Sequence, residues 1–222
     1  MILGIIQARM SSTRLPGKVL MPLCGKPMLH HQIERAGRAK LIDKLVVATS
    51  SNAEDDAIAD GCPVPCYRGS LDDVLDRFFD VALVEQPHYI VRMTGDCPLI
   101  DAGVIDALIE YHLEGEYDYT SNIDTYIDGL DVEIFSFQVL SDIWAEAKKP
   151  YDREHVTPYV RDHPEQFNIG KLPGSNLRHI HLSVDTQADF DLIRKVYQKL
   201  YPHNHKFSTR ECLIFLESLK PY

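Results

Sequence analysis

Short apolar runs alternate along the first hundred residues with segments whose apolar positions recur every three or four residues. The runs predict buried β-strands at residues 2–6, 44–49, 64–68 and 89–93. The recurring positions predict helices between them, most clearly at Val74, Leu75, Phe78, Val81 and Ala82. Strand and helix alternate four times with short connections, which predicts an α/β fold with a mostly parallel sheet and helices on both faces.

The pattern changes from about residue 115. Strands are predicted here at residues 117–121, 131–137, 167–172 and 179–184. Helices are predicted at residues 139–147, 153–162, 187–200 and 209–219. We expect some antiparallel pairing on the same sheet, so all 222 residues are interpreted as a single domain in which residues 115–175 form a small mixed insertion.

Three short patterns predict where helices begin. Ser51-x-x-Glu54 and Ser70-x-x-Asp73 have the spacing of a capping box, in which side chains bond the free backbone groups of the first turn. Asp101 directly precedes another predicted helix, so it is expected to cap that helix.

A basic loop follows the first predicted strand. Residues 7–18 read Gln-Ala-Arg-Met-Ser-Ser-Thr-Arg-Leu-Pro-Gly-Lys, so small hydroxyl residues surround the three cations Arg9, Arg14 and Lys18. Open α/β sheets bind ligands at the carboxyl ends of their strands, and Arg and Lys neutralise phosphate oxygens. The loop therefore predicts a polyphosphate site, and the alternative is a basic loop that only faces solvent. It is not a Walker loop, because Ser12 and Val19 replace the required Gly and the required Ser or Thr.

Two carboxylates are expected beside this loop. Asp96 follows the fourth predicted strand, and Asp185 follows the strand predicted at residues 179–184. Both stand where the carboxyl ends of strands meet, so we predict that they converge on the basic loop. Mg²⁺ binds one or two carboxylates together with phosphate oxygens, which suits this arrangement. The alternative is that each carboxylate caps the helix that follows it, a role for which Thr186 is a second candidate.

The net charge of −10 disfavours nucleic acid as a partner. Residues 1–44 nevertheless contain eight Lys or Arg against two acidic residues, a net charge of +6, so the remainder of the chain carries −16. Positive charge concentrated around the first loop favours a small anionic ligand there.

Membrane, secretory and zinc signals are missing from the sequence. The chain has no run of about 18 apolar residues and does not begin with a secretory leader, so we expect a cytoplasmic protein without a membrane partner. Its five cysteines are an odd, scattered set. Cys62 and Cys66 lack a second Cys or His pair to complete a zinc site, so reduced structural thiols are expected.

The basic loop resembles the opening motif of the cytidylyltransferases that make CMP-activated sugars. The resemblance is closest to their spore coat polysaccharide biosynthesis branch, which is related to the acylneuraminate and 3-deoxy-manno-octulosonate cytidylyltransferases. It recurs around Asp96 and Asp185 and in residues 68–77, 129–133 and 153–158. The resemblance implies a Rossmann-like nucleotidyltransferase fold and a reaction in which CTP and a sugar give a CMP-sugar and pyrophosphate.

The resemblance also implies roles for individual residues. Arg9 and Lys18 match the phosphate-contacting cations, and with Asp96 they are the predicted catalytic residues. Asp96 and Asp185 match the ligands of Mg²⁺, the predicted cofactor. The nucleotide is expected to contact Gln7, Ala8, Arg9, Ser12, Arg14, Lys18, Ser70, Arg77, Thr94 and Asp96.

The sugar acceptor is expected to bind the insertion. Its predicted contacts are Asp131, Glu133, Arg153 and His155, since carboxylates accept hydrogen bonds from hydroxyls and a cation suits the carboxylate of an acidic sugar. The alternative for the last two is a pair of solvated residues in a first helical turn. In the related acylneuraminate and octulosonate enzymes this half also builds a dimer, so a homodimer is expected.

Two departures from the family pattern bear on the sugar. Thr94 stands where the octulosonate enzymes have Gln, and Thr13 stands where the acylneuraminate loop has a basic residue, so neither of these two sugars is favoured. Two other functions stay open. One is a glycosyltransferase that uses a nucleotide sugar, for which Asp72-Asp73 and Asp189-Phe-Asp191 are poor substitutes for a metal-binding Asp-x-Asp. The other is a nucleotide-binding protein without catalysis, against which the two candidate metal carboxylates argue.

Overall fold

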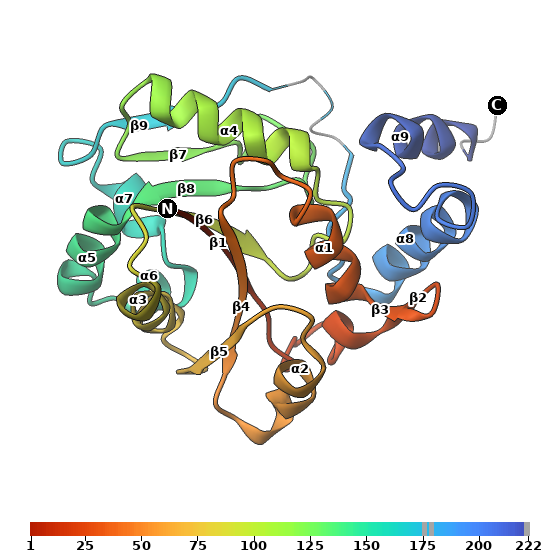
Figure 1. Cartoon of the computed structure of the whole chain (residues 1–222), viewed down its shortest axis with the longest axis horizontal. Helices are drawn as coiled ribbons and strands as arrows, with labels where there is room; N and C mark the ends of the chain where they lie inside the picture. Colours follow the sequence, from red (N-terminus) through yellow and green to blue (C-terminus); the bar gives the residue numbers. More distant parts are fainter. Residues whose placement is uncertain (175–176, 178–179, 220–222) are drawn as a thin grey trace.

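A seven-stranded sheet runs through the computed structural model, which describes residues 1–174, 177 and 180–219 (Figure 1). The strand order is β5-β4-β1-β6-β8-β7-β9. The strands are β1 (Ile2–Gln7), β4 (Lys44–Ser50), β5 (Cys66–Gly69), β6 (Tyr89–Thr94), β7 (Tyr119–Ser121), β8 (Glu133–Ser136) and β9 (Ile169–Lys171). Neighbouring strands are parallel except that β8 is antiparallel to both β6 and β7. The predicted mostly parallel sheet, with antiparallel pairing in the second half, is confirmed.

Both faces of the sheet are buried beneath helices (Figure 1). Successive strand residues point to opposite faces, so Leu3 and Ile5 of β1 pack in one core and Ile6 packs in the other. The first core is covered by α3 (Val74–Glu85), α5 (Phe137–Glu146) and α7 (Pro158–Asp162). The second is covered by α1 (Met28–Ala36), α2 (Asp56–Gly61) and α4 (Ala102–Glu114). This two-sided burial explains why the strands are apolar without alternation.

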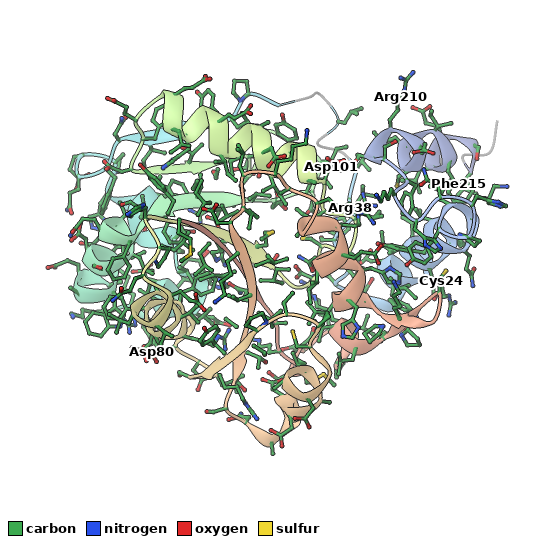
Figure 2. All side chains as sticks on the ribbon, viewed as in Figure 1. Cys24, Arg38, Asp80, Asp101, Arg210 and Phe215 are labelled. Atoms are coloured by element: carbon green, nitrogen blue, oxygen red, sulfur yellow. The ribbon has the colours of Figure 1, made fainter. Side chains whose placement is uncertain are left out.

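A third core holds the C-terminal helices α8 (Gln187–Leu200) and α9 (Thr209–Ser218) against a small hairpin of β2 (Pro22–Leu23) and β3 (Lys26–Pro27). The hairpin turns at Cys24 and Gly25, which both have positive φ, and it was not predicted. Two hydrogen bonds connect this core to the helices that cover the sheet (Figure 2). Arg38, just after α1, donates to the carbonyl oxygen of His205, and Thr209 at the start of α9 donates to Asp101, just before α4. No helix among the described residues has the length and apolar character needed to cross a bilayer.

Two predicted elements of the second half were wrong. The helix predicted at residues 153–162 is two short helices, α6 (Pro150–His155) and α7, because Val156 between them adopts a positive φ of 71°. The strand predicted at 179–184 forms only an isolated bridge between His181 and Asp128 in its described part, and its first residue lies outside the described residues.

The helix starts were predicted with mixed success. Asp101 caps α4 by accepting a hydrogen bond from the backbone N–H of Gly103 at 2.8 Å, as expected. The residue that caps α3 is Asp73 rather than Ser70, whose hydroxyl instead accepts a hydrogen bond from the backbone of Asp73. The capping box predicted at residues 51–54 is wrong, because the chain makes a 3₁₀ turn at Ala53–Asp55 without a side-chain cap.

Candidate active site

A cavity of about 350 Å³ lies at the carboxyl ends of β1 and β6. The loop after β1 forms one wall, the start of α3, the end of β6 and α6 form others, and Asp185 completes it. The lining residues are Gln7, Ala8, Arg9, Ser12, Thr13, Arg14, Lys18, Val19, Val74, Arg77, Arg92, Thr94, Gly95, Asp96, Glu154, His155 and Asp185. The structure therefore brings together every predicted nucleotide and metal residue except Ser70.

Close backbone contact between two strand ends shapes the floor of this cavity. The N–H of Gly95 donates to the carbonyl oxygen of Gln7 at 2.8 Å. A Cβ atom at position 95 would lie 2.8 Å from that same oxygen and 3.1 Å from the Cβ of Ala8. Only glycine fits without displacing the first loop, so the Gly95-Asp96 pair places the Asp96 carboxylate directly beside the basic loop.

Lys18 connects the basic loop to both predicted metal ligands. It follows Gly17, whose φ of 72° makes the bend that starts a 3₁₀ turn at Lys18–Leu20. Its Nζ donates to Asp96 Oδ2 at 3.1 Å, to Asp185 Oδ1 at 3.1 Å and to the carbonyl oxygen of Val184 at 2.6 Å. The convergence of Asp96 and Asp185 is thus present in the structure.

The charge state of Asp96 follows from these contacts. Burial disfavours its carboxylate, but the charge of Lys18 and hydrogen bonds from Thr94 and Lys18 outweigh burial, so the pKa of Asp96 is lowered. Within the described residues no three His, Cys, Asp or Glu side chains gather as a complete metal site. Two ionised carboxylates are nevertheless the protein ligands expected of Mg²⁺ when phosphate oxygens supply the rest, so the donor set fits this ion.

The other two cations of the loop also pair with acids across the cavity. Arg9 Nη2 lies 3.1 Å from Glu154 Oε1 on α6, and Arg14 Nη2 lies 2.9 Å from Asp185 Oδ1. These side chains are partly or largely exposed, so their ion pairs are weak and can exchange with a ligand. Asp185 caps no helix, since Thr186 forms the capping box of α8 with Asp189.

Arg77 differs from the other cations because it is buried without a carboxylate partner among the described residues. Its Nη1 donates to the carbonyl oxygen of Ser70 at 2.9 Å, while its Nε has no acceptor. Burial, together with the charge of Arg9, lowers the pKa of Arg77 to about 10, so it stays protonated at neutral pH. A buried, unpaired donor on a cavity wall is suited to an acceptor atom of a ligand.

Only one of the four residues predicted to bind the acceptor lines the cavity, and that residue is His155. Arg153 points to α3 instead, where its Nη2 lies 2.6 Å from Asp73 Oδ2. The carboxylate of Asp131 is mostly buried beside Gly129, and burial with the charge of Asp128 raises its pKa to about 7. Glu133 is fully buried and bound to Arg92. An acceptor role for these three residues stays a prediction without support from the cavity wall.

Two charged wall residues were missed by the sequence analysis, Glu154 and Arg92. An arginine inside the apolar run Tyr89-Ile-Val-Arg-Met was a usable signal, because a charge in a buried strand needs a partner or a function. Glu154 stands inside the segment 153–158 that carries the family resemblance, but the site was predicted at Arg153 and His155 on either side of it.

Comparison with protein families decides what kind of protein this is. A family model described as Cytidylyltransferase matches residues 3–211. The chain belongs to the cytidylyltransferase family. Its activity is therefore that of a CTP-using nucleotidyltransferase, and the resemblance noted in the sequence is confirmed.

This cytidylyltransferase is similar to named relatives over different lengths. The spore coat polysaccharide biosynthesis protein SpsF of Bacillus subtilis is 36% identical over 209 residues, which cover 89% of this chain and 87% of SpsF. The 3-deoxy-manno-octulosonate cytidylyltransferase of Solibacter usitatus is 42% identical over only 109 residues, 49% of this chain and 43% of that enzyme. The structure of a cytidylyltransferase from Leptospira borgpetersenii superposes with a TM-score of 0.91 at 32% identity, covering 98% of this chain and 94% of that one.

Proposed function

We propose that this cytidylyltransferase transfers CMP from CTP to a hydroxyl group of a sugar, and so makes a CMP-sugar and pyrophosphate with Mg²⁺. The observation that carries the proposal is the convergence of Lys18, Asp96 and Asp185 on the wall of one cavity. The similarity to SpsF supports a sugar that serves a cell-surface polysaccharide, and an acidic sugar is a first candidate.

The residues of the cavity suit the charge changes of this reaction. Arg9, Arg14 and Lys18 would hold the triphosphate and stabilise the pyrophosphate as it leaves, because their charges face the place where negative charge develops. Asp96 and Asp185 would hold Mg²⁺, which neutralises phosphate charge and makes the α-phosphate more electrophilic. Arg77 would donate its unpaired Nε–H to the nucleotide. Positioning and charge neutralisation carry such transfers without a covalent intermediate on the protein.

A pyrophosphate assay tests the proposal. The protein is incubated with Mg²⁺, a panel of acidic and neutral sugars, and CTP, UTP, GTP or ATP in turn. We expect pyrophosphate only with CTP and a matching sugar, together with a CMP-sugar in the same amount. A glycosyltransferase would release no pyrophosphate, and a non-catalytic nucleotide-binding protein would bind CTP without product.

The structure lends no support to a glycosyltransferase. Two of the candidate metal carboxylates serve as helix caps, since Asp73 accepts a hydrogen bond from the backbone N–H of Asp76 and Asp189 accepts one from the backbone N–H of Thr186. Neither Asp73 nor Asp189 lines the cavity.

The acceptor is proposed to enter beside α6, next to His155. We expect His155→Ala to raise KM for the sugar and to leave the dissociation constant for CTP unchanged. Arg153→Ala is the matched control, because Arg153 stands two residues away on the same helix but contacts Asp73 rather than the cavity. A weaker CTP affinity in His155→Ala would instead place this residue in the nucleotide pocket.

The proposal includes a homodimer in the cytoplasm, built through the insertion at residues 115–175. The support is the family resemblance together with Tyr151, an aromatic side chain that is exposed on α6 and packs its ring 4.5 Å from that of His155. All five cysteines are free, as a reducing compartment allows. Light scattering of the purified protein tests the dimer.

A further inference from the structure

The ammonium group of Lys18 fills the space that the two predicted metal ligands share. One carboxylate oxygen of Asp96 and one of Asp185 each lie 3.1 Å from its Nζ, and the carbonyl oxygen of Val184 lies 2.6 Å away. An ammonium group has three N–H donors, and these three acceptors use all of them. In this arrangement Lys18 has no donor left for a phosphate oxygen.

A divalent cation and this ammonium group exclude each other. Mg²⁺ holds its oxygen ligands at about 2.0–2.1 Å, so an ion bound to both carboxylates takes the place of a nitrogen that already lies between them. Two cations this close repel strongly where water is scarce, and the side chain of Lys18 is only 9% exposed.

The side chain of Lys18 is the part that can move. Its backbone is held by two hydrogen bonds. The N–H of Gly17 donates to the carbonyl oxygen of Met10 at 2.8 Å, and the N–H of Met21 donates to the carbonyl oxygen of Lys18 at 3.1 Å. The four-carbon stem of a lysine, in contrast, rotates freely enough to carry its charge over several ångströms. Lys18 also lines the cavity, so its ammonium can reach a ligand there without a change of fold.

We propose that Lys18 is an internal competitor of the metal ion, which occupies the Asp96–Asp185 pair until the triphosphate of CTP draws it away. This inference rests on the proposed function. The triphosphate offers the ammonium new acceptors, and its departure frees both carboxylates for the metal. Metal and CTP then bind cooperatively, and each raises the affinity of the other by the same factor. The nucleotide-free enzyme therefore holds the metal weakly.

Titration of the nucleotide-free protein with Mn²⁺, followed by the electron paramagnetic resonance signal of the free ion, tests this. Mn²⁺ prefers the same oxygen ligands as Mg²⁺. We expect Lys18→Met to bind Mn²⁺ at least tenfold more tightly than the wild type. Adding Asp185→Asn to Lys18→Met should remove the gain, because it removes one of the two carboxylates.

Two matched controls separate competition at the site from a general change of charge. Arg14→Met also removes a cation 2.9 Å from Asp185, but from an exposed side chain outside the shared space, so its gain should stay below threefold. Lys26→Met removes a cation that pairs with Glu34 on α1, and it should leave the Mn²⁺ affinity unchanged.

Equal Mn²⁺ affinities of the wild type and Lys18→Met, in variants with the circular dichroism of the wild type, would overturn the competition. Metal-dependent pyrophosphate release by the wild type would in that case leave the proposed function standing. Lys18→Gln, which removes the charge but keeps N–H donors for the buried oxygens, replaces the Met variant where the latter does not fold. If no variant binds Mn²⁺ and product formation needs no divalent ion, both the competition and the metal assignment of the proposed function are wrong.

Discussion

Two groups of ion pairs in this cytidylyltransferase use the same chemistry in opposite surroundings. Arg92 of β6 and Glu133 of β8 stand opposite each other in antiparallel register and are almost fully buried. Tyr119 and Thr157 each donate a hydrogen bond of 2.5 Å to the same carboxylate oxygen of Glu133. The carboxylates of the cavity pairs are more open, from 23% exposed in Asp185 to 44% in Glu154.

The difference in burial shows which ion pairs stabilise the fold and which belong to a ligand site. Burial raises the pKa of Glu133, but the charge of Arg92 and the hydrogen bonds from Thr157 and Tyr119 outweigh it, so the pKa is lowered and the carboxylate stays charged. Arg92 lines the cavity but Glu133 does not, and the pair between them joins the antiparallel strand β8 to the parallel half of the sheet. The cavity pairs join the loop after β1 to other elements and can exchange partners, which a phosphate-binding site requires.

The largest effect is expected where the buried pair is broken. Glu133→Ala removes the acceptor of Arg92 Nη1 and of the hydroxyls of Tyr119 and Thr157, so the free energy of unfolding should fall by about 3–5 kcal/mol. Urea denaturation measures it. Glu146→Ala, on the exposed surface of α5, is the control and should stay within about 0.5 kcal/mol of the wild type.

A double variant shows whether the charge pair itself is needed. Arg92→Met with Glu133→Leu replaces both partners by apolar groups and should recover most of the stability lost in Glu133→Ala. A loss of under about 1 kcal/mol in Glu133→Ala alone would mean that the sheet does not depend on this pair.

The same contrast explains what the sequence predicted well. Arg9, Lys18, Asp96 and Arg77 were correctly expected to gather, because each stands in the loop after a strand or on the helix that follows one, and parallel strands end at one edge. Local pattern therefore predicted the parallel strands of the first half of the chain and most of the charged residues around the cavity.

The features that the sequence did not predict depend on contacts from far along the chain. Glu133 was expected to meet a sugar, but Tyr119, Thr157 and Arg92 enclose it, and none of these is within ten residues of it. The break at Val156 likewise depends on packing, since Val156 is fully buried in the first core and no Gly or Asn marks its positive φ. Periodicity carries no information about such contacts.

The next largest effect concerns the cavity. Asp96→Asn should lower kcat by about 10²–10³-fold without a comparable loss of stability, because it removes a charge that acts on the reacting phosphates rather than on the core. Asp96→Asn with Asp185→Asn should be little worse than the more damaging single change, as for residues that act as a unit. Asp80→Asn, exposed on α3 (Figure 2), is the control in the same pyrophosphate assay. Additive losses in the double variant would show that the two carboxylates do not share one ion.

A smaller effect is expected from pH on the stability of the fold, through the buried side chain of His112 on α4. Burial lowers the pKa of His112 from 6.5 to about 4, and its Nδ1 is 2.9 Å from Thr120 Oγ1 on β7. The unfolded chain takes up a proton below about pH 6.5 while the folded chain keeps His112 neutral, so stability falls as the pH falls. Between pH 7 and pH 5 His112 should account for a loss of about 2 kcal/mol.

His112→Gln isolates this contribution, because glutamine keeps a polar group near Thr120 but does not titrate. Urea denaturation at pH 7 and pH 5 should show a smaller loss for the variant than for the wild type. The Lys18–Asp96 pair does not share this dependence, since the lowered pKa of Asp96 keeps its carboxylate charged over the whole range. An identical loss in both proteins would place the pH sensitivity elsewhere.

The smallest effect should come from the Arg9–Glu154 pair, the exposed cavity pair whose acid lies on α6. Arg9 must leave Glu154 before it can meet a phosphate, so Glu154→Gln should tighten CTP binding by about two- to fivefold, the range of an exposed ion pair. Calorimetry with CTP in the absence of a sugar measures this directly. Glu146→Gln makes the same change of charge outside the cavity and should leave the affinity unchanged. The gain should also vanish in Arg9→Met, because the competing pair is then absent. Weaker CTP binding in Glu154→Gln would mean the reverse: that Glu154 holds Arg9 in the position from which it contacts the nucleotide.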